Sequence, residues 1–292
     1  MKKCVFTGAG VAIVTPFTKD GVDYDKLGEL IEFQIKEKTD AIVICGTTGE
    51  ASTMPDDEHI AVISYTVKKV NGRLPVIAGT GSNDTMHAIN LSKRAEQAGA
   101  DAILSVSPYY NKTTQRGLYE HFKAIAKSIS IPVVLYNVPS RTNLNINPDT
   151  VKQLSEIDNI VAIKECNLNQ VAEIINLCGE NFTVYSGEDG LVVPLMSLGG
   201  KGVISVMANI IPGDTHNMAS RFLAGDIEGS RRLQLKVVEL VKALFSEVSP
   251  IPVKEAMNLM GMSVGKCRMP LVDMSEKNKE LLIKAMKNYK LI

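Results

Sequence analysis

Lys164 closes a run of apolar residues that begins at Ile160. A charged lysine is costly to bury, so a lysine in this position needs either an ion-pair partner or a lowered pKa. Glu165 is a poor partner for it, because successive side chains of a strand point to opposite faces. A desolvated lysine becomes a neutral amine that can attack a carbonyl group. The pattern therefore indicates covalent chemistry at Lys164, with an ion pair to some other acid as the alternative.

Tyr136 lies in the apolar run Val133–Asn137, which precedes the run that ends at Lys164. The two side chains should therefore be neighbours in a sheet. A phenol beside an imine-forming lysine can donate and accept protons. A packed tyrosine with a satisfied hydroxyl is the alternative. Arg141 follows shortly afterwards, and its guanidinium group suits a bidentate contact with a substrate carboxylate, unless it is simply a solvated surface residue.

Three further segments follow apolar runs. Residues 46–50 read Gly-Thr-Thr-Gly-Glu, where the hydroxyls of Thr47 and Thr48 and the exposed amides could hold a carboxylate, or could cap the next helix. The paired aromatics of Pro108-Tyr109-Tyr110-Asn111 are typical of an interface. Gly187 and Ile204 lie at later strand ends, where backbone groups could line a pocket.

The elements that must position these residues are eight short apolar runs. They span Val11–Thr15, Ala41–Cys45, Val76–Gly79, Ala102–Val106, Val133–Asn137, Ile160–Lys164, Thr183–Ser186 and Gly202–Ser205. Helical patterns separate them, which predicts a parallel sheet covered on both faces. Eight such units favour a (β/α)8 TIM barrel, with an open doubly wound sheet as the rival. The active site should then lie at the carboxyl ends of the strands.

The chain after Ser205 shows helical patterns only. We expect residues 1–225 to form the barrel with the catalytic site, and residues 226–292 to form a C-terminal helical extension. Within the extension, residues 231–245 are expected to form one helix, and Asp273 with Glu276 predicts a capping box for the last helix. The extension carries no evident chemistry, so packing or subunit contact is its expected role.

The composition narrows the function classes. The 292 residues contain 32 Lys and Arg and 32 Asp and Glu, so there is no basic excess for binding nucleic acid. No apolar run is long enough for a membrane span, and the amino-terminal segment is too short in its apolar part for a signal peptide. The five cysteines lack metal or redox spacing, which is typical of a reduced cytoplasmic protein.

Cofactor motifs are also incomplete. The four histidines show none of the paired spacings of a zinc site, so we expect no metal. Residues 79–83, Gly-Thr-Gly-Ser-Asn, lack the third glycine of a dinucleotide fingerprint and predict a tight turn after a strand. We therefore expect an enzyme that works without a cofactor.

Four motifs, taken together, are specific. Gly-Thr-Thr-Gly-Glu at 46–50, Tyr-Tyr-Asn at 109–111, Tyr-Asn-Val-Pro-Ser-Arg-Thr at 136–142 and Ile-Lys-Glu at 163–165 occur in that order. The chain closely resembles the 4-hydroxy-tetrahydrodipicolinate (dihydrodipicolinate) synthase family, within the pyruvate-dependent class I aldolases that include N-acetylneuraminate lyase. The resemblance covers essentially the whole chain.

The resemblance implies a Schiff base between Lys164 and pyruvate. The enamine formed from it would attack L-aspartate 4-semialdehyde, in the diaminopimelate route to L-lysine. Tyr136, Thr47 and Tyr110 would pass protons in this cycle, with Tyr110 contributed across a subunit interface. The family is usually a homotetramer built as a pair of tight dimers.

The resemblance also implies binding roles. Thr48 would help hold the pyruvate carboxylate, Ile204 would offer a backbone contact, and Arg141 would bind the carboxylate of the semialdehyde. The Ser-Arg-Thr run around Arg141 resembles the synthases. The alternative is another Schiff-base pyruvate aldolase, such as an N-acetylneuraminate lyase or a 2-keto-3-deoxy sugar-acid aldolase.

Many family members are inhibited by L-lysine at the dimer interface. The corresponding positions here keep His59, Asn83 and Tyr109. Asp56, however, stands where lysine-sensitive members often carry histidine, and His87 stands where they often carry glutamate. Losing that carboxylate removes a partner for the ammonium group of the effector, so we expect weak or absent inhibition by lysine.

Overall fold

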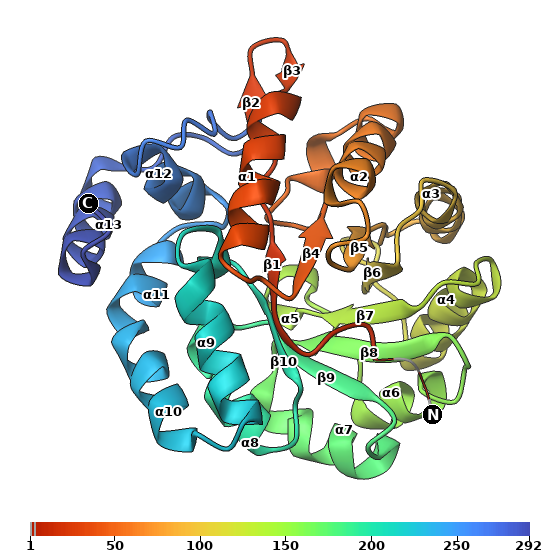
Figure 1. The fold of residues 1–292 in the computed structure, drawn as a ribbon. Helices are drawn as coiled ribbons and strands as arrows, with labels where there is room; N and C mark the ends of the chain where they lie inside the picture. Colours follow the sequence, from red (N-terminus) through yellow and green to blue (C-terminus); the bar gives the residue numbers. More distant parts are fainter. Residues whose placement is uncertain (1, 3) are drawn as a thin grey trace.

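Eight parallel strands close into a barrel surrounded by helices in the computed structural model, which describes residue 2 and residues 4–292 (Figure 1). The strands are β1 (Gly8–Ala12), β4 (Ala41–Ile44), β5 (Val76–Gly79), β6 (Ala102–Val106), β7 (Val133–Asn137), β8 (Ile160–Glu165), β9 (Thr183–Ser186) and β10 (Gly202–Ser205). Their order is β1-β10-β9-β8-β7-β6-β5-β4, and β4 pairs back with β1. The predicted (β/α)8 TIM barrel with C-terminal helices is confirmed.

The first strand is the one that the sequence pattern misplaced. It spans Gly8–Ala12 rather than the expected residues 11–15. Gly8 and Gly10 carry no β-branched or apolar side chain, so the hydrophobic pattern begins only at Val11. The structure needs a small residue there, because a Cβ on Gly10 would lie 2.9 Å from the Phe6 ring inside the barrel.

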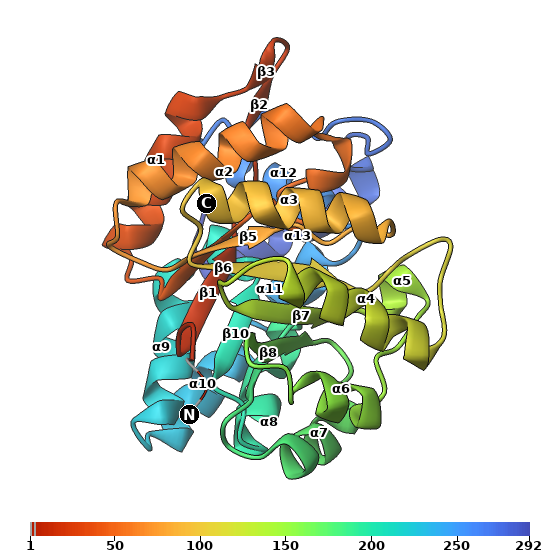
Figure 2. The ribbon, with the colours of Figure 1, turned by 90° about the vertical axis from the view of Figure 1, so that its right-hand side faces the viewer.

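Eight helices follow the barrel strands in turn and form the outer ring. They are α1 (Tyr24–Lys36), α2 (Asp56–Val70), α3 (Thr85–Gln97), α4 (Gln115–Lys127), α6 (Pro148–Leu154), α7 (Val171–Cys178), α8 (Val192–Ser197) and α9 (Pro212–Leu223). Shorter elements lie in the connections: the helix α5 (Pro139–Thr142), and the 3-10 turns η1 (Ala51–Thr53), η2 (Leu168–Gln170), η3 (Asp189–Leu191) and η4 (Met207–Asn209). A hairpin of β2 (Phe17–Thr18) and β3 (Gly21–Val22) projects from the barrel (Figure 2).

The C-terminal extension, residues 226–292, contains α10 (Ile227–Lys236), α11 (Val238–Leu244), α12 (Ile251–Leu259) and α13 (Glu276–Tyr289), which lie on one side of the barrel (Figure 1). The single helix expected over residues 231–245 is interrupted at Val237, which lets α10 pack on α8 and α9 while α11 packs on α12 and α13. The expected capping box is also wrong. Ser275 precedes α13, and Asp273 instead pairs with Lys266.

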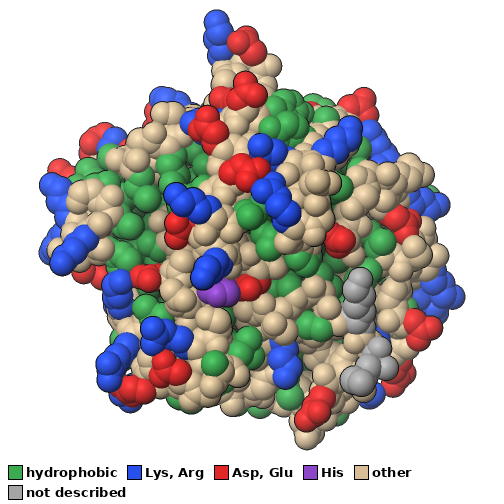
Figure 3. Space-filling view, viewed as in Figure 1, with side chains coloured by type: hydrophobic (Ala, Val, Ile, Leu, Met, Phe, Trp, Pro, Cys, Tyr) green, Lys and Arg blue, Asp and Glu red, His purple; other side chains and the backbone are tan. Residues whose placement is uncertain are grey.

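One end of the barrel is closed by the amino-terminal segment. The Phe6 ring stacks on Tyr185 with ring centres 4.3 Å apart, and the Tyr185 hydroxyl donates to the Phe6 carbonyl at 2.7 Å. The carboxyl ends of the strands lie at the opposite end. Figure 3 shows acidic and basic side chains interspersed over one face of the molecule. No helix among the described residues has both the length and the apolar character needed to cross a membrane.

Candidate active site

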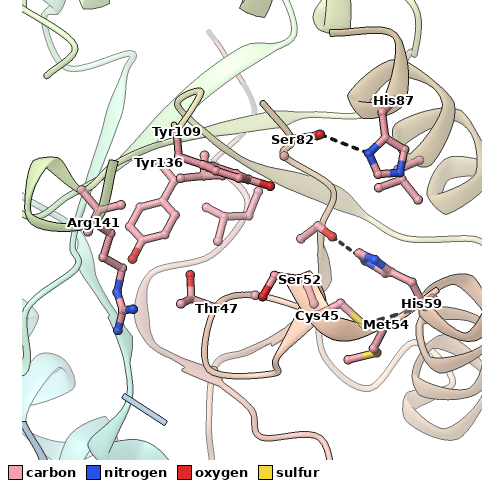
Figure 4. Close-up of a pocket in the computed structure, with 18 of the residues that line it drawn as sticks. Cys45, Thr47, Ser52, Met54, His59, Ser82, His87, Tyr109, Tyr136 and Arg141 are labelled. Atoms are coloured by element: carbon pink, nitrogen blue, oxygen red, sulfur yellow. Dashed lines mark hydrogen bonds between the residues drawn. The ribbon is translucent and has the colours of Figure 1, made fainter. Parts of the chain in front are cut away.

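Two adjoining cavities lie where the strands end. The first, the Lys164 cavity, has a volume of about 270 Å³, and the residues lining it include Lys164, Tyr136, Thr47, Thr48, Arg141 and Gly187. The second, the His59 cavity, has a volume of about 410 Å³ and extends to α2 and α3 (Figure 4). Thr47, Tyr136 and Arg141 line both cavities. The structure therefore brings together six of the residues singled out from the sequence.

The register of β7 against β8 places Tyr136 directly beside Lys164. Lys164 is only 5% exposed, and its Nζ lies 4.5 Å from the centre of the Tyr136 ring. Burial lowers the pKa of Lys164, although Cys166, Asp189 and Glu188 nearby oppose that shift. Among the residues that the structure describes, none accepts a hydrogen bond from this Nζ. Burial therefore favours the neutral amine, which is the form that can act as a nucleophile.

The Tyr136 side chain faces Thr47 and Arg141 across the wall shared by the two cavities (Figure 4). Burial raises the pKa of Tyr136 above its ordinary value, while Arg141 and the Thr47 side chain oppose the shift. The phenol therefore carries its proton at neutral pH and can donate it to a group that forms beside Lys164.

Arg141 and Gly187 shape the rest of the Lys164 cavity. Arg141 comes from α5, and its Nη2 donates to the Ser249 carbonyl at 3.2 Å. A Cβ on Gly187 would lie 2.3 Å from Cys166 Sγ and 3.1 Å from Lys164 Cε. Glycine at this position leaves the space that the lysine side chain occupies.

Two expected site residues stand apart from these. The Tyr110 side chain is 91% exposed and lines neither cavity. Its loop is tied back by Asn111, whose side-chain amide donates to the Asn83 carbonyl at 3.0 Å. Ile204 is fully buried in the barrel interior and also lines neither cavity. Neither residue reaches the Lys164 cavity with its own side chain in the single chain.

The model of the dihydrodipicolinate synthetase family matches residues 5–289 of this chain. The chain belongs to this family. The 4-hydroxy-tetrahydrodipicolinate synthase of Acetivibrio thermocellus is 73% identical over 292 residues, which is 100% of both chains. The crystal structure of dihydrodipicolinate synthase from Aquifex aeolicus matches with a TM-score of 0.96 and 47% identity, over 98% of this chain and 99% of that one. A dihydrodipicolinate synthase from Acinetobacter baumannii, described as complexed with pyruvate, matches with a TM-score of 0.95 and 44% identity, over 98% and 99% of the two chains.

The sequence patterns missed several residues of this family member's Lys164 cavity. Glu188 lines it and directly follows Gly187 after β9, so its position at a strand end was a usable signal. The C-terminal extension, expected only to pack, also contributes to the wall through Phe245 and residues 247–249. That expectation was too narrow. These residues lie between α11 and α12, where neither strand periodicity nor a motif marks them.

Cys45 and Cys166 differ in their surroundings. Cys45 is buried, whereas Cys166 is partly exposed and lines the Lys164 cavity. Burial raises the pKa of the Cys166 thiol to about 12, so this side chain stays a neutral thiol beside the lysine.

Glu165 lies on the other face of β8, as the alternation of strand side chains predicted. Its carboxylate accepts from the Asn137 amide at 2.8 Å, from Gln170 Nε2 at 2.9 Å and from the Asn167 backbone at 2.7 Å. Burial raises the pKa of Glu165 to about 7, although these donors oppose the shift. The network joins the ends of β7 and β8 behind Tyr136 and Lys164.

Polar side chains of the His59 cavity bond to one another and to the strand ends. His59 Nε2 donates to the Gly79 carbonyl at 2.8 Å, and burial lowers the pKa of His59. His87 Nε2 lies 2.9 Å from Asp56 Oδ1, and the other ring nitrogen of His87 lies 3.1 Å from Ser82 Oγ (Figure 4). Across the described part of the chain, no group of three or more His, Cys, Asp or Glu side chains could hold a metal ion.

Proposed function

We propose that the protein is a 4-hydroxy-tetrahydrodipicolinate synthase, which condenses pyruvate with L-aspartate 4-semialdehyde through a Schiff base on Lys164, in the diaminopimelate route to L-lysine. The observation that carries the proposal is the Lys164 amine, buried in a cavity beside Tyr136 with a lowered pKa. The family, and the names of relatives such as the one from Acetivibrio thermocellus, support the same activity.

The first half of the reaction activates pyruvate. The Lys164 Nζ attacks the keto carbon of pyruvate, and water leaves to give a protonated imine. The imine draws electrons from the adjacent methyl group, which loses a proton to give an enamine. Thr48 and the backbone of residues 46–48 would hold the pyruvate carboxylate, because these residues line the cavity that contains Lys164.

The second half forms a carbon–carbon bond. The enamine carbon attacks the aldehyde carbon of the semialdehyde, whose carboxylate is held by Arg141. The amine of the bound product then attacks the imine carbon, displaces Lys164 and closes the ring. Tyr136 and Thr47 carry the protons that these steps release and consume, since both line the wall shared by the two cavities.

Tyr110 enters this scheme only with a second copy of the chain. Its exposed side chain lines neither cavity of its own chain. We propose a homotetramer, built as a pair of tight dimers in the cytoplasm, in which Tyr110 crosses the tight-dimer interface and completes the proton relay. Tyr110→Phe should slow turnover and leave the assembly intact in sedimentation velocity. Unchanged turnover would remove Tyr110 from the relay.

Borohydride reduction in the presence of pyruvate tests the proposed function. The reduced adduct should map to the peptide that contains Lys164, because reduction converts the imine into a stable secondary amine. Activity should then appear with L-aspartate 4-semialdehyde and not with N-acetylneuraminate or 2-keto-3-deoxy sugar acids. An adduct on another side chain, or none, would overturn the mechanism.

Inhibition by L-lysine should be weak or absent. Asp56 and His87 interact with each other in the His59 cavity, and no glutamate stands at position 87 to receive an ammonium group. A steady-state titration with lysine should leave most of the activity at low millimolar concentration. Strong inhibition in that range would contradict this expectation.

A further inference from the structure

A second buried lysine lies in the C-terminal extension. Lys254, in α12, is 2% exposed. Its Nζ donates to Glu50 Oε1 at 2.8 Å, to the Lys266 carbonyl at 2.9 Å and to the Thr15 carbonyl at 3.1 Å. An ammonium group has three protons to donate, so each of them has an acceptor. The ammonium also lies 4.6 Å from the centre of the Phe17 ring.

The Glu50 carboxylate is equally well satisfied. One oxygen accepts from Lys254, and the other accepts from the Arg268 backbone amide at 2.8 Å. Glu50 is the last residue of the Gly-Thr-Thr-Gly-Glu segment, and its backbone is left-handed, with φ of 57°. A non-glycine residue in that conformation is held there by its surroundings.

Short bonds connect this pair to the threonines of the proposed pyruvate site. The Glu50 amide donates to the Thr47 carbonyl at 3.1 Å. Gly49, between them, accepts from the Thr15 hydroxyl at 2.7 Å, and Thr15 is itself bound by Lys254 through its carbonyl. Lys254 therefore binds both Glu50 and Thr15, the two residues whose bonds fix the turn at Gly49. A Cβ on Gly49 would lie 3.2 Å from two backbone atoms.

We propose that the Glu50–Lys254 pair is a positioning device through which the C-terminal extension sets the conformation of residues 46–50, so that Thr47 and Thr48 face Lys164. The inference rests on the proposed function, because it assigns Thr48 to the pyruvate carboxylate. Stability alone does not account for the pair, since well-packed apolar residues often replace buried ion pairs without loss. What an apolar pair could not reproduce is the set of directed bonds to Thr15, Lys266 and Arg268.

The experiment compares Lys254→Met and Glu50→Gln with the double variant that carries both substitutions. Lys279→Met is the matched control, because Lys279 binds Glu255 at 2.7 Å and joins α13 to α12 without touching residues 46–50. The full-length proteins are compared by thermal unfolding, by sedimentation, and by the separate kcat and KM for pyruvate. Borohydride trapping at graded pyruvate concentrations gives the affinity for the first step alone.

We expect Lys254→Met and Glu50→Gln to raise the KM for pyruvate about tenfold, with a smaller change in kcat, because the groups that hold the carboxylate are displaced. The double variant should recover thermal stability relative to Lys254→Met and keep the raised KM. Lys279→Met should leave the KM unchanged.

Two results would overturn the proposal. One is a pyruvate KM in both single variants that matches the Lys279→Met control. The other is a KM that returns to the wild-type value in the double variant together with the thermal stability. If Lys254→Met does not fold, the milder Glu50→Gln variant decides the question. Failure of the wild-type protein to trap pyruvate on Lys164 would instead defeat the proposed function, which separates the two failures.

Discussion

Lys164 and Lys254 are both buried, but their surroundings differ in the hydrogen-bond acceptors that they offer to the side-chain nitrogen. Lys254 has a carboxylate and two carbonyls as acceptors for its three protons. Lys164 faces the Tyr136 ring, and burial lowers its pKa. The first environment supplies an acceptor for each proton of an ammonium group, whereas the second favours the neutral amine.

The difference shows that burial alone does not make a lysine reactive. Burial penalises the charged form, but a complete set of acceptors offsets the penalty. Glu188 and Asp189 lie near Lys164 and oppose the shift of its pKa without reversing it. Lys164, the lysine that we propose reacts with pyruvate, is therefore the one whose neighbourhood leaves the desolvation penalty uncompensated.

Among the variants that test this difference between the two lysines, Lys164→Met should have the largest effect on activity. We expect activity to fall by at least about a thousandfold, because Lys164 is the only lysine among the described residues that line its cavity. The variant should fold as stably as the wild-type protein, because it no longer buries an uncompensated amine.

The wild-type protein should lose stability relative to Lys164→Met as the pH falls. The folded-state pKa of Lys164 lies below the ordinary lysine pKa of 10.5, so the stability contributed by this group is present above pH 10.5 and is lost as pH falls through the folded-state pKa. Thermal unfolding from about pH 10 down to about pH 6 should therefore favour the variant progressively over the wild-type protein. A variant that is much less stable at neutral pH would show that Lys164 is a structural residue like Lys254.

Cys166→Asp would make the surroundings of Lys164 resemble those of Lys254. A carboxylate at this position lies near the lysine, because a Cβ on Gly187 would contact both Cys166 Sγ and Lys164 Cε. Stabilising the ammonium should slow adduct formation with pyruvate about a hundredfold at neutral pH, with recovery as pH rises. Cys166→Asn is the matched neutral control, and stopped-flow kinetics would measure both. Equal rates for Asp and Asn would refute the electrostatic explanation.

Glu165→Gln should have the smallest effect. The pKa of Glu165 is raised from 4.5 to about 7 by burial, so the stability that this group contributes is complete below pH 4.5 and is lost as pH rises through about 7. We expect the variant to be less stable by about 1–3 kcal/mol at the acidic end, with the gap shrinking towards neutral pH. Denaturant unfolding at several pH values measures the gap, and a gap that widens with pH would contradict the assignment.

The sequence predicted the barrel well because each strand buries both faces and is therefore apolar at nearly every position. Tyr136 and Lys164 could be placed together once the strands were recognised, because adjacent parallel strands bring their carboxyl ends to one edge. The prediction was wrong at β1, whose glycines hide the pattern. It also missed the break at Val237, because apolar spacing continues through it.

The C-terminal contribution could not be predicted on the same grounds. Residues 247–249 line the Lys164 cavity from a connection between helices, which carries no periodic signal. Lys254 stands just after Pro250 and Pro252 and looks like any polar residue on a helix surface. Its burial follows from the approach of Glu50, which no local pattern around either residue encodes.

Glu50 and Lys254 are 204 positions apart in the sequence, so the ribosome adds them at well-separated times. At typical rates of translation, roughly 10 to 40 seconds separate the emergence of the two residues from the ribosome. During that interval the Glu50 carboxylate cannot bind Lys254, and this remains so after the last barrel strand, β10, is complete at Ser205. A nascent chain that stops before α12 would therefore hold Lys164 without the bonds that fix residues 46–50, so only the finished polypeptide can assemble the complete site.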